Sequence, residues 1–188
     1  MNKLSFNILP SPESNDHEIR ILIDDEDFLG KDYLGLDPPS FFSQDNLDKD
    51  GDIMVGRCTC GVEGCGDYPV TVVVNHDNVL WTNDNGLNLI FERQDYDRSI
   101  DTAKNDFSWE DIKRKVERLT TNILKQTHTR DNYIFNWASA RITDKQITLS
   151  YSKKNGDQKL LYITWDGQSE INVEHNAKQF LIDKLNAE

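Results

Sequence analysis

The stretch YPVTVVVNHDNVLWTNDNGLNLIF, residues 68–91, decides the fold class of this 188-residue chain. β-branched residues dominate 69–74, and polar turn residues separate this run from further apolar runs at 79–82 and 87–91. β-branched and aromatic runs of this length favour strands, and an Asn-Asp-Asn-Gly turn favours a hairpin between two of them. The stretch therefore predicts a three-stranded antiparallel meander.

Helical patterns follow the meander, and the same succession returns in the second half of the chain. Two helices are predicted at 91–105 and 108–128, and the longer one has apolar residues at the spacing of a buried face: Trp109, Ile112, Val116, Leu119 and Ile123. Ser108 with Asp111 resembles a capping box at its start. Three strands and a final helix from about residue 171 come next.

The order β-β-β-α is thus predicted twice, over 68–128 and 131–187. The fold class is α+β, with antiparallel sheet and segregated helices. Two more strands are expected at 4–9 and 18–24, before a stretch that reads as irregular up to residue 56. A chain of this length favours one compact domain over 1–188. The alternative is a boundary near 101–107 between an N-terminal and a C-terminal lobe.

The composition is that of an acidic globular protein. Hydrophobic residues make up 37%, and 33 acidic residues outnumber 21 basic ones, for a net charge of -12. Such a surface repels nucleic acid and anionic membranes, and it suits a basic partner or a cation. No apolar run approaches the ~18 residues of a membrane span or forms a signal peptide. A soluble, cytoplasmic protein is expected.

All three cysteines lie in RCTCGVEGCGDYP, residues 57–69. Cys58 and Cys60 would point to one side of an extended chain, and the intervening glycines would let Cys65 fold back beside them. Thiolates on a short reversing loop suit zinc, which takes four ligands in structural sites. The fourth would come from His76, Asp67, Glu63, His17 or a neighbouring subunit, and His76 completes the ligand set that we predict for a metal.

A packed turn is the competing interpretation of the cysteine loop, and the sequence favours it. The paired C-x2-C signature of a zinc ribbon is absent, and Arg57 is the only nearby cation that could lower the pKa of a thiol. We therefore predict no cofactor, with zinc as the metal that the alternative would bind. An odd number of cysteines in a reducing compartment also argues against a disulfide framework.

The run R-C-x-C-G-x-x-G-C-G at 57–66 is followed by Trp81 and by F-E-R-x-x-Y, which comprises Phe91, Glu92, Arg93 and Tyr96. This pattern resembles a loosely related group of uncharacterised bacterial proteins that carry C-x-C-G-x-x-G-C, V-x-W and F-[DE]-R-x-x-Y. The resemblance covers residues 18–100. It implies a shared fold element, and the group has no established activity or cofactor to carry over.

Two acidic segments are candidates for cation binding. Residues 46–57 match several positions of an EF-hand loop, but Arg57 stands where the bidentate Glu belongs. With Pro38-Pro39 upstream and the cysteine loop downstream, two helices cannot flank this segment. The run of carboxylates at 24–27 follows a predicted strand. Both segments are interpreted as solvated loops.

Two functions remain open. The first is a non-enzymatic interaction protein, of the immunity-protein or accessory kind, whose acidic surface binds a basic protein. It is favoured by the net charge and by the lack of a Walker loop, G-x-S-x-G or H-E-x-x-H motif. The second is a small metal-binding module, or a metal-dependent enzyme, that uses Cys58, Cys60 and Cys65. The sequence leans towards binding rather than catalysis.

Overall fold

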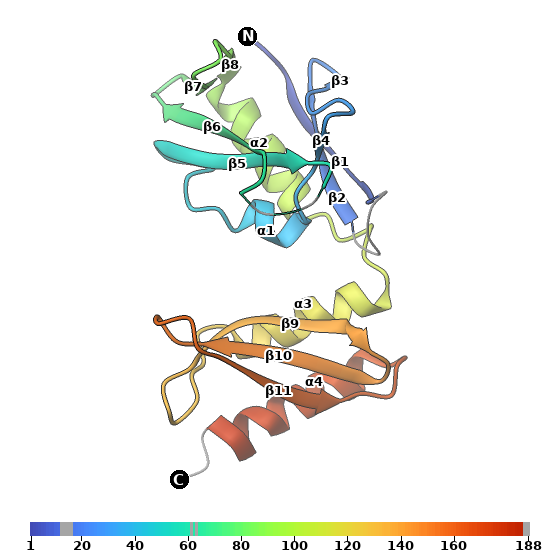
Figure 1. Cartoon of the computed structure of the whole chain (residues 1–188). Helices are drawn as coiled ribbons and strands as arrows, with labels where there is room; N and C mark the ends of the chain where they lie inside the picture. The colour runs from blue at the N-terminus through green and yellow to red at the C-terminus, as the bar shows by residue number, and fades with distance from the viewer. Residues whose placement is uncertain (12–16, 61, 63, 186–188) are drawn as a thin grey trace. The chain divides into compact units, whose positions relative to one another are not determined.

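The computed structural model of the chain divides into two compact units, Met1–Trp109 (unit 1) and Glu110–Glu188 (unit 2) (Figure 1). Each unit has its own hydrophobic core. The boundary falls a few residues beyond 101–107, where the sequence allowed a seam. No helix of the described part is long and apolar enough to cross a membrane. The residues that the structure describes are 1–11, 17–60, 62 and 64–185.

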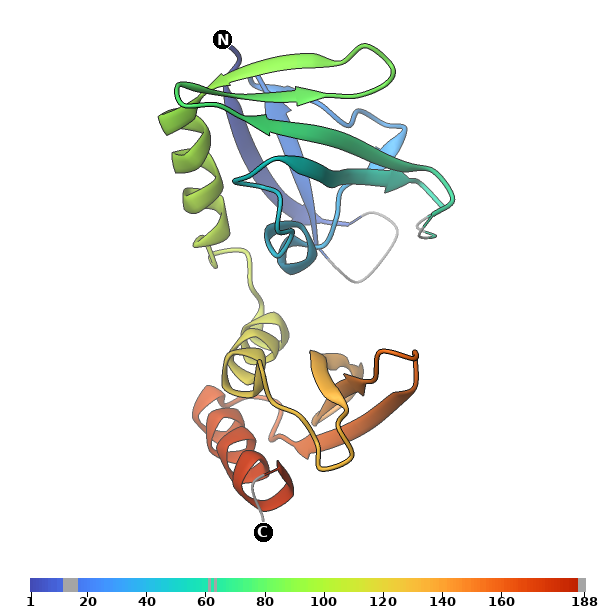
Figure 2. The same ribbon diagram turned by 90° about the vertical axis from the view of Figure 1, so that its left-hand side faces the viewer.

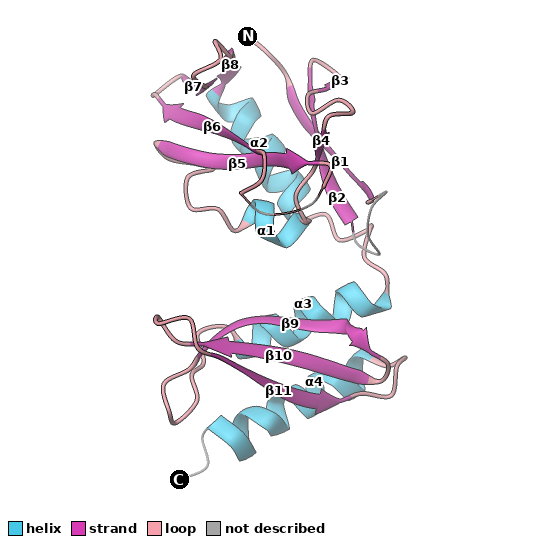
Figure 3. Cartoon of the chain, in the orientation of Figure 1, coloured by secondary structure: helices cyan, strands magenta, loops and turns pink. Residues whose placement is uncertain are grey.

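Unit 1 contains two antiparallel sheets in its described residues, with strand orders β1-β2-β3 and β4-β5-β6-β7-β8 (Figure 3). The residues between the strands include the short helix α1, and the longer helix α2 follows the last strand. The elements are β1 (Leu4–Pro10), β2 (His17–Ile23), β3 (Glu26–Asp27), β4 (Tyr33–Leu34), α1 (Pro38–Phe42), β5 (Gly51–Cys58), β6 (Asp67–Val74), β7 (Asn78–Thr82), β8 (Asn88–Glu92) and α2 (Arg93–Lys104).

An aromatic cluster holds α2 against the sheets of unit 1. Trp81 on β7, Phe91 on β8 and Tyr96 on α2 are almost fully buried and contact one another edge to face or tilted. The Trp81 indole N–H donates to the Tyr96 hydroxyl, which donates to the backbone carbonyl of Leu47. Burial of such rings is the main favourable contribution of a core of this kind.

Unit 2 is a three-stranded antiparallel sheet, in the order β11-β10-β9, with α3 and α4 side by side on one face (Figure 2). The inward-facing Ile147, Leu149 and Tyr151 of β10 form the centre of its core. The elements are α3 (Ile112–Leu124), β9 (Ile134–Thr143), β10 (Gln146–Ser152), β11 (Gln158–Thr164), α4 (Glu170–Phe180) and a π-helical turn η1 (Leu181–Leu185).

The structure confirms the α+β class with antiparallel sheets and segregated helices. The order β-β-β-α also occurs twice, as β6-β7-β8-α2 and β9-β10-β11-α4. The two copies differ, however. The first contributes three strands to a five-stranded sheet, and α3, which the sequence pattern assigned to the first copy, belongs to unit 2.

The predicted buried face of α3 is correct only in part: Val116 is fully buried and Ile123 packs against the core of unit 2. Ile112 is 37% exposed, whereas Arg114, Glu117 and Thr120 are buried beside Val116. Polar residues occupy these positions because the Glu117 carboxylate accepts hydrogen bonds from groups on β9, which helical periodicity does not reveal. The residue that caps the N-terminus of α3 also differs from the predicted Ser108.

The N-cap of α3 is Asp111, whose side chain accepts from the Arg114 N–H. A second difference lies upstream, where the sequence read residues 25–56 as irregular. Residues 51–58 form β5, the second strand of the larger sheet.

Candidate metal centre

The β5–β6 connection positions the three cysteines. Cys58 is the last residue of β5, and Asp67 is the first residue of β6, so the connection is short. Arg57 and Asp67 are paired across the two strands, which holds both ends of the connection in register. Cys60 and Cys65 lie within it, and the chain returns towards Cys58 through Gly64 and Gly66.

The three thiols converge. The Sγ atoms of Cys58, Cys60 and Cys65 all lie within 4.8 Å of one another. The two sulfurs of the C-x-C pair are 2.6 Å apart, and none of the three forms a disulfide. Cys58 is partly buried, while Cys60 and Cys65 are exposed, so an ion could reach the cluster from solvent.

Gly66 permits this close return of the chain. A Cβ at position 66 would lie 3.0 Å from the Cβ of Cys58, which is tighter than ordinary van der Waals contact, and 3.5 Å from its Sγ. Gly64 has a positive φ of 78°, a conformation that glycine adopts without strain. The two glycines are therefore the local reason why Cys65 turns back towards the C-x-C pair.

Hydrogen bonding between the thiols separates their pKa values. A side-chain hydrogen bond with Cys58, with help from the backbone at Val62 and from Cys65, lowers the pKa of Cys60. Hydrogen bonding to Cys60 and Cys58 raises the pKa of Cys65 to about 11. Cys60 therefore ionises more readily than Cys65, because hydrogen bonds stabilise the Cys60 thiolate.

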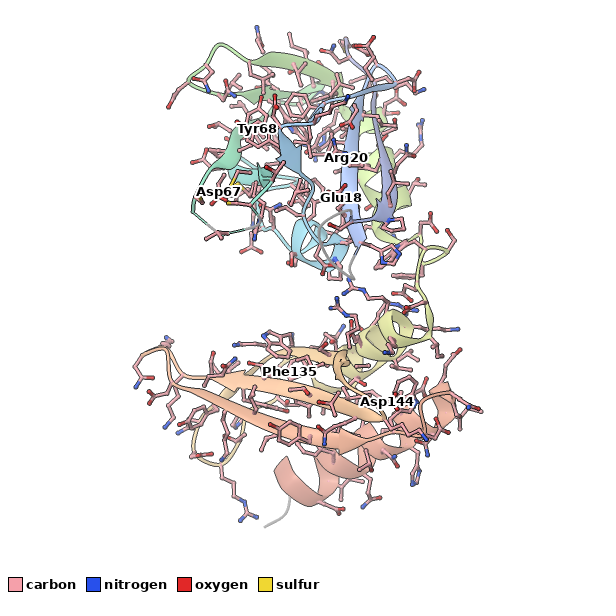
Figure 4. The ribbon with its side chains drawn as sticks, turned by 45° about the vertical axis from the view of Figure 1, so that its right-hand side comes forward. Glu18, Arg20, Asp67, Tyr68, Phe135 and Asp144 are labelled. Atoms are coloured by element: carbon pink, nitrogen blue, oxygen red, sulfur yellow. The ribbon has the colours of Figure 1, made fainter. Side chains whose placement is uncertain are left out.

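Asp67 contributes a carboxylate to the same loop. Its Oδ2 accepts from the backbone N–H of Gly64 at 3.1 Å, which turns the side chain back towards the connection. Its Oδ1 is buried and has no hydrogen-bond partner. Figure 4 labels Asp67 at the end of β6 that joins the connection, apart from Glu18 and Arg20 on β2.

His76, which the sequence placed among the metal ligands, does not join the three cysteines. It lies two residues beyond β6, a strand of eight residues or about 25 Å, at the other end from the thiols. Its side chain is 96% exposed and contacts Asp77. His17 packs against Trp109 with ring centroids 5.0 Å apart. Glu63 lies outside the described residues.

The acidic segment at 24–27 is held by cations and amides of unit 1. The Asp24 carboxylate accepts from Asn2 and from the Lys3 backbone N–H, and Asp25 pairs with the Lys3 ammonium. Asp27 pairs with Arg20 at 2.6 Å. In the described part of the chain these carboxylates therefore fix the ends of strands and do not gather around a common point.

The EF-hand-like segment is similarly occupied by structural hydrogen bonds. Asp50 accepts from the Val74 backbone N–H, and Asp52 accepts from the Thr71 hydroxyl, both on β6. These bonds join the start of β5 to its neighbour. The segment is therefore part of the β5–β6 ladder rather than a calcium loop between two helices.

Charge is divided unequally between the units. Of the 33 acidic residues, 22 lie in unit 1 and 11 in unit 2, whereas the 21 basic residues divide into 8 and 13. The formal charge is therefore -14 for residues 1–109 and +2 for residues 110–188. The acidity of the chain is a property of the unit that carries the thiols.

Comparisons of the chain with protein-family models, with curated proteins and with solved structures found no match.

Proposed function

We propose that the protein is a metal-binding module that holds a zinc ion through Cys58, Cys60 and Cys65. The observation that carries the proposal is the convergence of the three Sγ atoms within 4.8 Å. Soft thiolate ligands on a short loop are the donor set that zinc favours in proteins. The ion would clamp the β5–β6 connection.

The geometry of the cluster supports this proposal. Zn–S bonds of about 2.3 Å place two tetrahedral sulfur ligands roughly 3.8 Å apart. That separation falls between the 2.6 Å of the C-x-C pair and the 4.8 Å limit of the cluster, so only small side-chain movements are needed. The lowered pKa of Cys60 favours its thiolate form, and the negative charge of unit 1 attracts a divalent cation.

The test is the zinc content of the full-length protein, measured by mass spectrometry, together with zinc affinity from competition with a chromophoric chelator. We expect about one zinc per chain, and Cys60→Ser should weaken binding by about 100-fold or more, beyond the usual effect of outer-shell substitutions. Thr59→Ser in the same loop is the matched control and should bind zinc as the wild type does. A metal-free protein that takes up no added zinc would refute the proposal.

Zinc affinity should also rise with pH. Because the pKa of Cys65 is about 11, this thiol is protonated at neutral pH and must lose its proton when it binds the ion. Metal binding therefore releases protons, and affinity increases about tenfold per pH unit for each proton released. Chelator competition between pH 6 and pH 8 measures this slope. A zinc affinity that does not change with pH would contradict ligation by a thiol that is protonated in the metal-free protein.

A second candidate function, the binding of a basic protein partner, is favoured by the charge of -14 on unit 1. The probe is a lysine octapeptide, with a glutamate octapeptide as its control. Binding of the lysine peptide should weaken steeply as salt is raised, because salt screens interactions between exposed charges. Equal binding of both peptides, or binding that ignores salt, would argue against this function.

A further inference from the structure

The three thiols leave one position of a tetrahedral zinc site to be filled. In the described part of the chain, no His, Asp or Glu atom lies within 4.8 Å of all three sulfurs. His76 and His17 are held elsewhere in unit 1. Among the described residues, a side chain of the loop that can turn towards the thiols is therefore the remaining candidate for this ligand.

Asp67 is the side chain placed to do this. It follows Cys65 by two residues, and the intervening Gly66 lies directly against the Cys58 side chain. The hydrogen bond from Gly64 to Oδ2 fixes the carboxylate to the backbone segment that precedes Cys65. Both anchors of Asp67 are thus parts of the cysteine loop itself.

The second carboxylate oxygen of Asp67, Oδ1, lacks an interaction that a bound ion could provide. Oδ1 is buried and has no hydrogen-bond partner in the described structure. A buried carboxylate oxygen without a partner is unfavourable, and native proteins satisfy nearly all such atoms. A cation held by the three thiolates would supply the missing interaction once the carboxylate turns towards it.

We propose that Asp67 Oδ1 is the fourth ligand and that the loop forms a Cys3Asp site. This inference rests on the proposed function. Three thiolates and one carboxylate carry four negative charges, so a divalent ion leaves a smaller residual charge than a monovalent one. The carboxylate also favours a borderline ion in tetrahedral geometry over Cu(I), which prefers purely soft ligands. The site therefore favours a divalent borderline ion such as zinc over Cu(I).

The experiment follows Co²⁺ bound to the full chain in place of zinc, since its absorption reports both the number of thiolates and the ligand field. Asp67→Asn should keep the sulfur-to-cobalt charge-transfer bands, shift the d–d bands and lower zinc affinity at least about tenfold. Asp67→Cys should raise the charge-transfer intensity by about one third, because four thiolates replace three. Asp77→Asn is the matched control and should change neither.

The outcomes separate this inference from the proposed function. If wild-type protein binds Co²⁺ through thiolates, and Asp67→Asn leaves the d–d bands and the zinc affinity unchanged, Asp67 is not a ligand while the three-cysteine site stands. If the wild type shows no charge-transfer bands at all, both proposals fail. If Asp67→Asn and Asp67→Cys both behave as expected, the Cys3Asp site is supported.

Discussion

Each unit buries one ion pair, Glu18 with Arg20 in unit 1 and Arg114 with Glu117 in unit 2, but the units differ in which member is the hub, the buried side chain that holds several partners of opposite polarity. In unit 1 the buried hub is a cation: Arg20 is 8% exposed and lies between the carboxylates of Glu18 and Asp27. In unit 2 the hub is an anion: Glu117 is 6% exposed and pairs with Arg114 and Arg141. The first unit carries a formal charge of -14 and the second +2, so each hub has the sign opposite to that of its unit.

The contrast has a physical reason. A buried charge is tolerated only when several groups of opposite polarity surround it. A unit rich in carboxylates supplies such groups for a guanidinium, and a unit in which basic residues are in excess supplies them for a carboxylate. The net charge therefore describes the surface of each unit. The sign of the buried hub depends on which groups of opposite polarity are abundant around it.

Replacement of the anionic hub should have the largest effect. Glu117 Oε1 accepts from the Ser139 hydroxyl and the Ala140 N–H, and Oε2 pairs with Arg114, so this one side chain fastens α3 to β9. Glu117→Ala should cost about 3–5 kcal/mol, because it leaves buried donors and a guanidinium without this acceptor. Urea unfolding of the full chain, with hydrogen exchange of α3 and β9 peptides, measures the loss.

The control for this prediction is Glu174→Ala. Glu174 forms an exposed pair with Lys178 one helical turn away, and its removal should cost at most about 0.5 kcal/mol. Hydrogen exchange in unit 1 should be unchanged by either substitution. If Glu117→Ala were as mild as Glu174→Ala, the buried hub would not stabilise unit 2.

The sequence predicted those parts of the fold that depend on local patterns. The three strands and the final helix predicted for residues 131–187 are present as β9, β10, β11 and α4. The same reasoning was only partly right for α3: it placed Val116 in the core but missed Glu117, which is buried by partners on β9 that are distant in sequence. It also missed β5. Asp52 in this strand and Asp50 just before it bond to β6, but in the sequence alone these carboxylates resemble those of a solvated loop.

The candidate site was predictable only where it depends on local sequence patterns. Spacing placed Cys58 and Cys60 on one side of the chain, and the glycines indicated that Cys65 would turn back; the three sulfurs do meet. The choice of His76 as a fourth ligand ignored the length of β6, which separates it from the loop. The unpartnered oxygen of Asp67 depends on burial, which no sequence pattern gives.

Replacement of the cationic hub should have the next largest effect. Arg20 donates to Asp27 and to the backbone carbonyl of Tyr33, and so holds the segment between β2 and β4. Arg20→Ala should cost about 3 kcal/mol, the lower end of the range for a broken buried pair, because Asp27 is 43% exposed and can be rehydrated. Loss of exchange protection should be confined to unit 1. A loss that spread equally to unit 2 would show that the hubs are not independent.

The smallest effects concern one buried tyrosine in each unit. Tyr96 bonds both Trp81 and the Leu47 carbonyl, so Tyr96→Phe leaves two buried polar groups without this partner and should cost about 1–3 kcal/mol. The Tyr151 hydroxyl contacts Thr127, which already bonds the Leu124 carbonyl. Tyr151→Phe should therefore cost only about 0.5–1.5 kcal/mol. Equal costs in urea unfolding would contradict this difference.

Alkaline pH offers an independent measure of the same pair. Desolvation by burial raises the pKa of Tyr96 and of Tyr151, so both hydroxyls stay neutral in the folded chain after they ionise in the unfolded chain. A raised pKa contributes stability that is present below the unfolded value of about 10 and is lost as the pH rises above it. Unfolding followed from pH 8 to pH 11 should show this loss in the wild type and less of it in either Phe variant. The larger reduction is expected for Tyr96→Phe, because Tyr96 is the more deeply desolvated hydroxyl, and a larger reduction for Tyr151→Phe would reverse the order proposed for the two units.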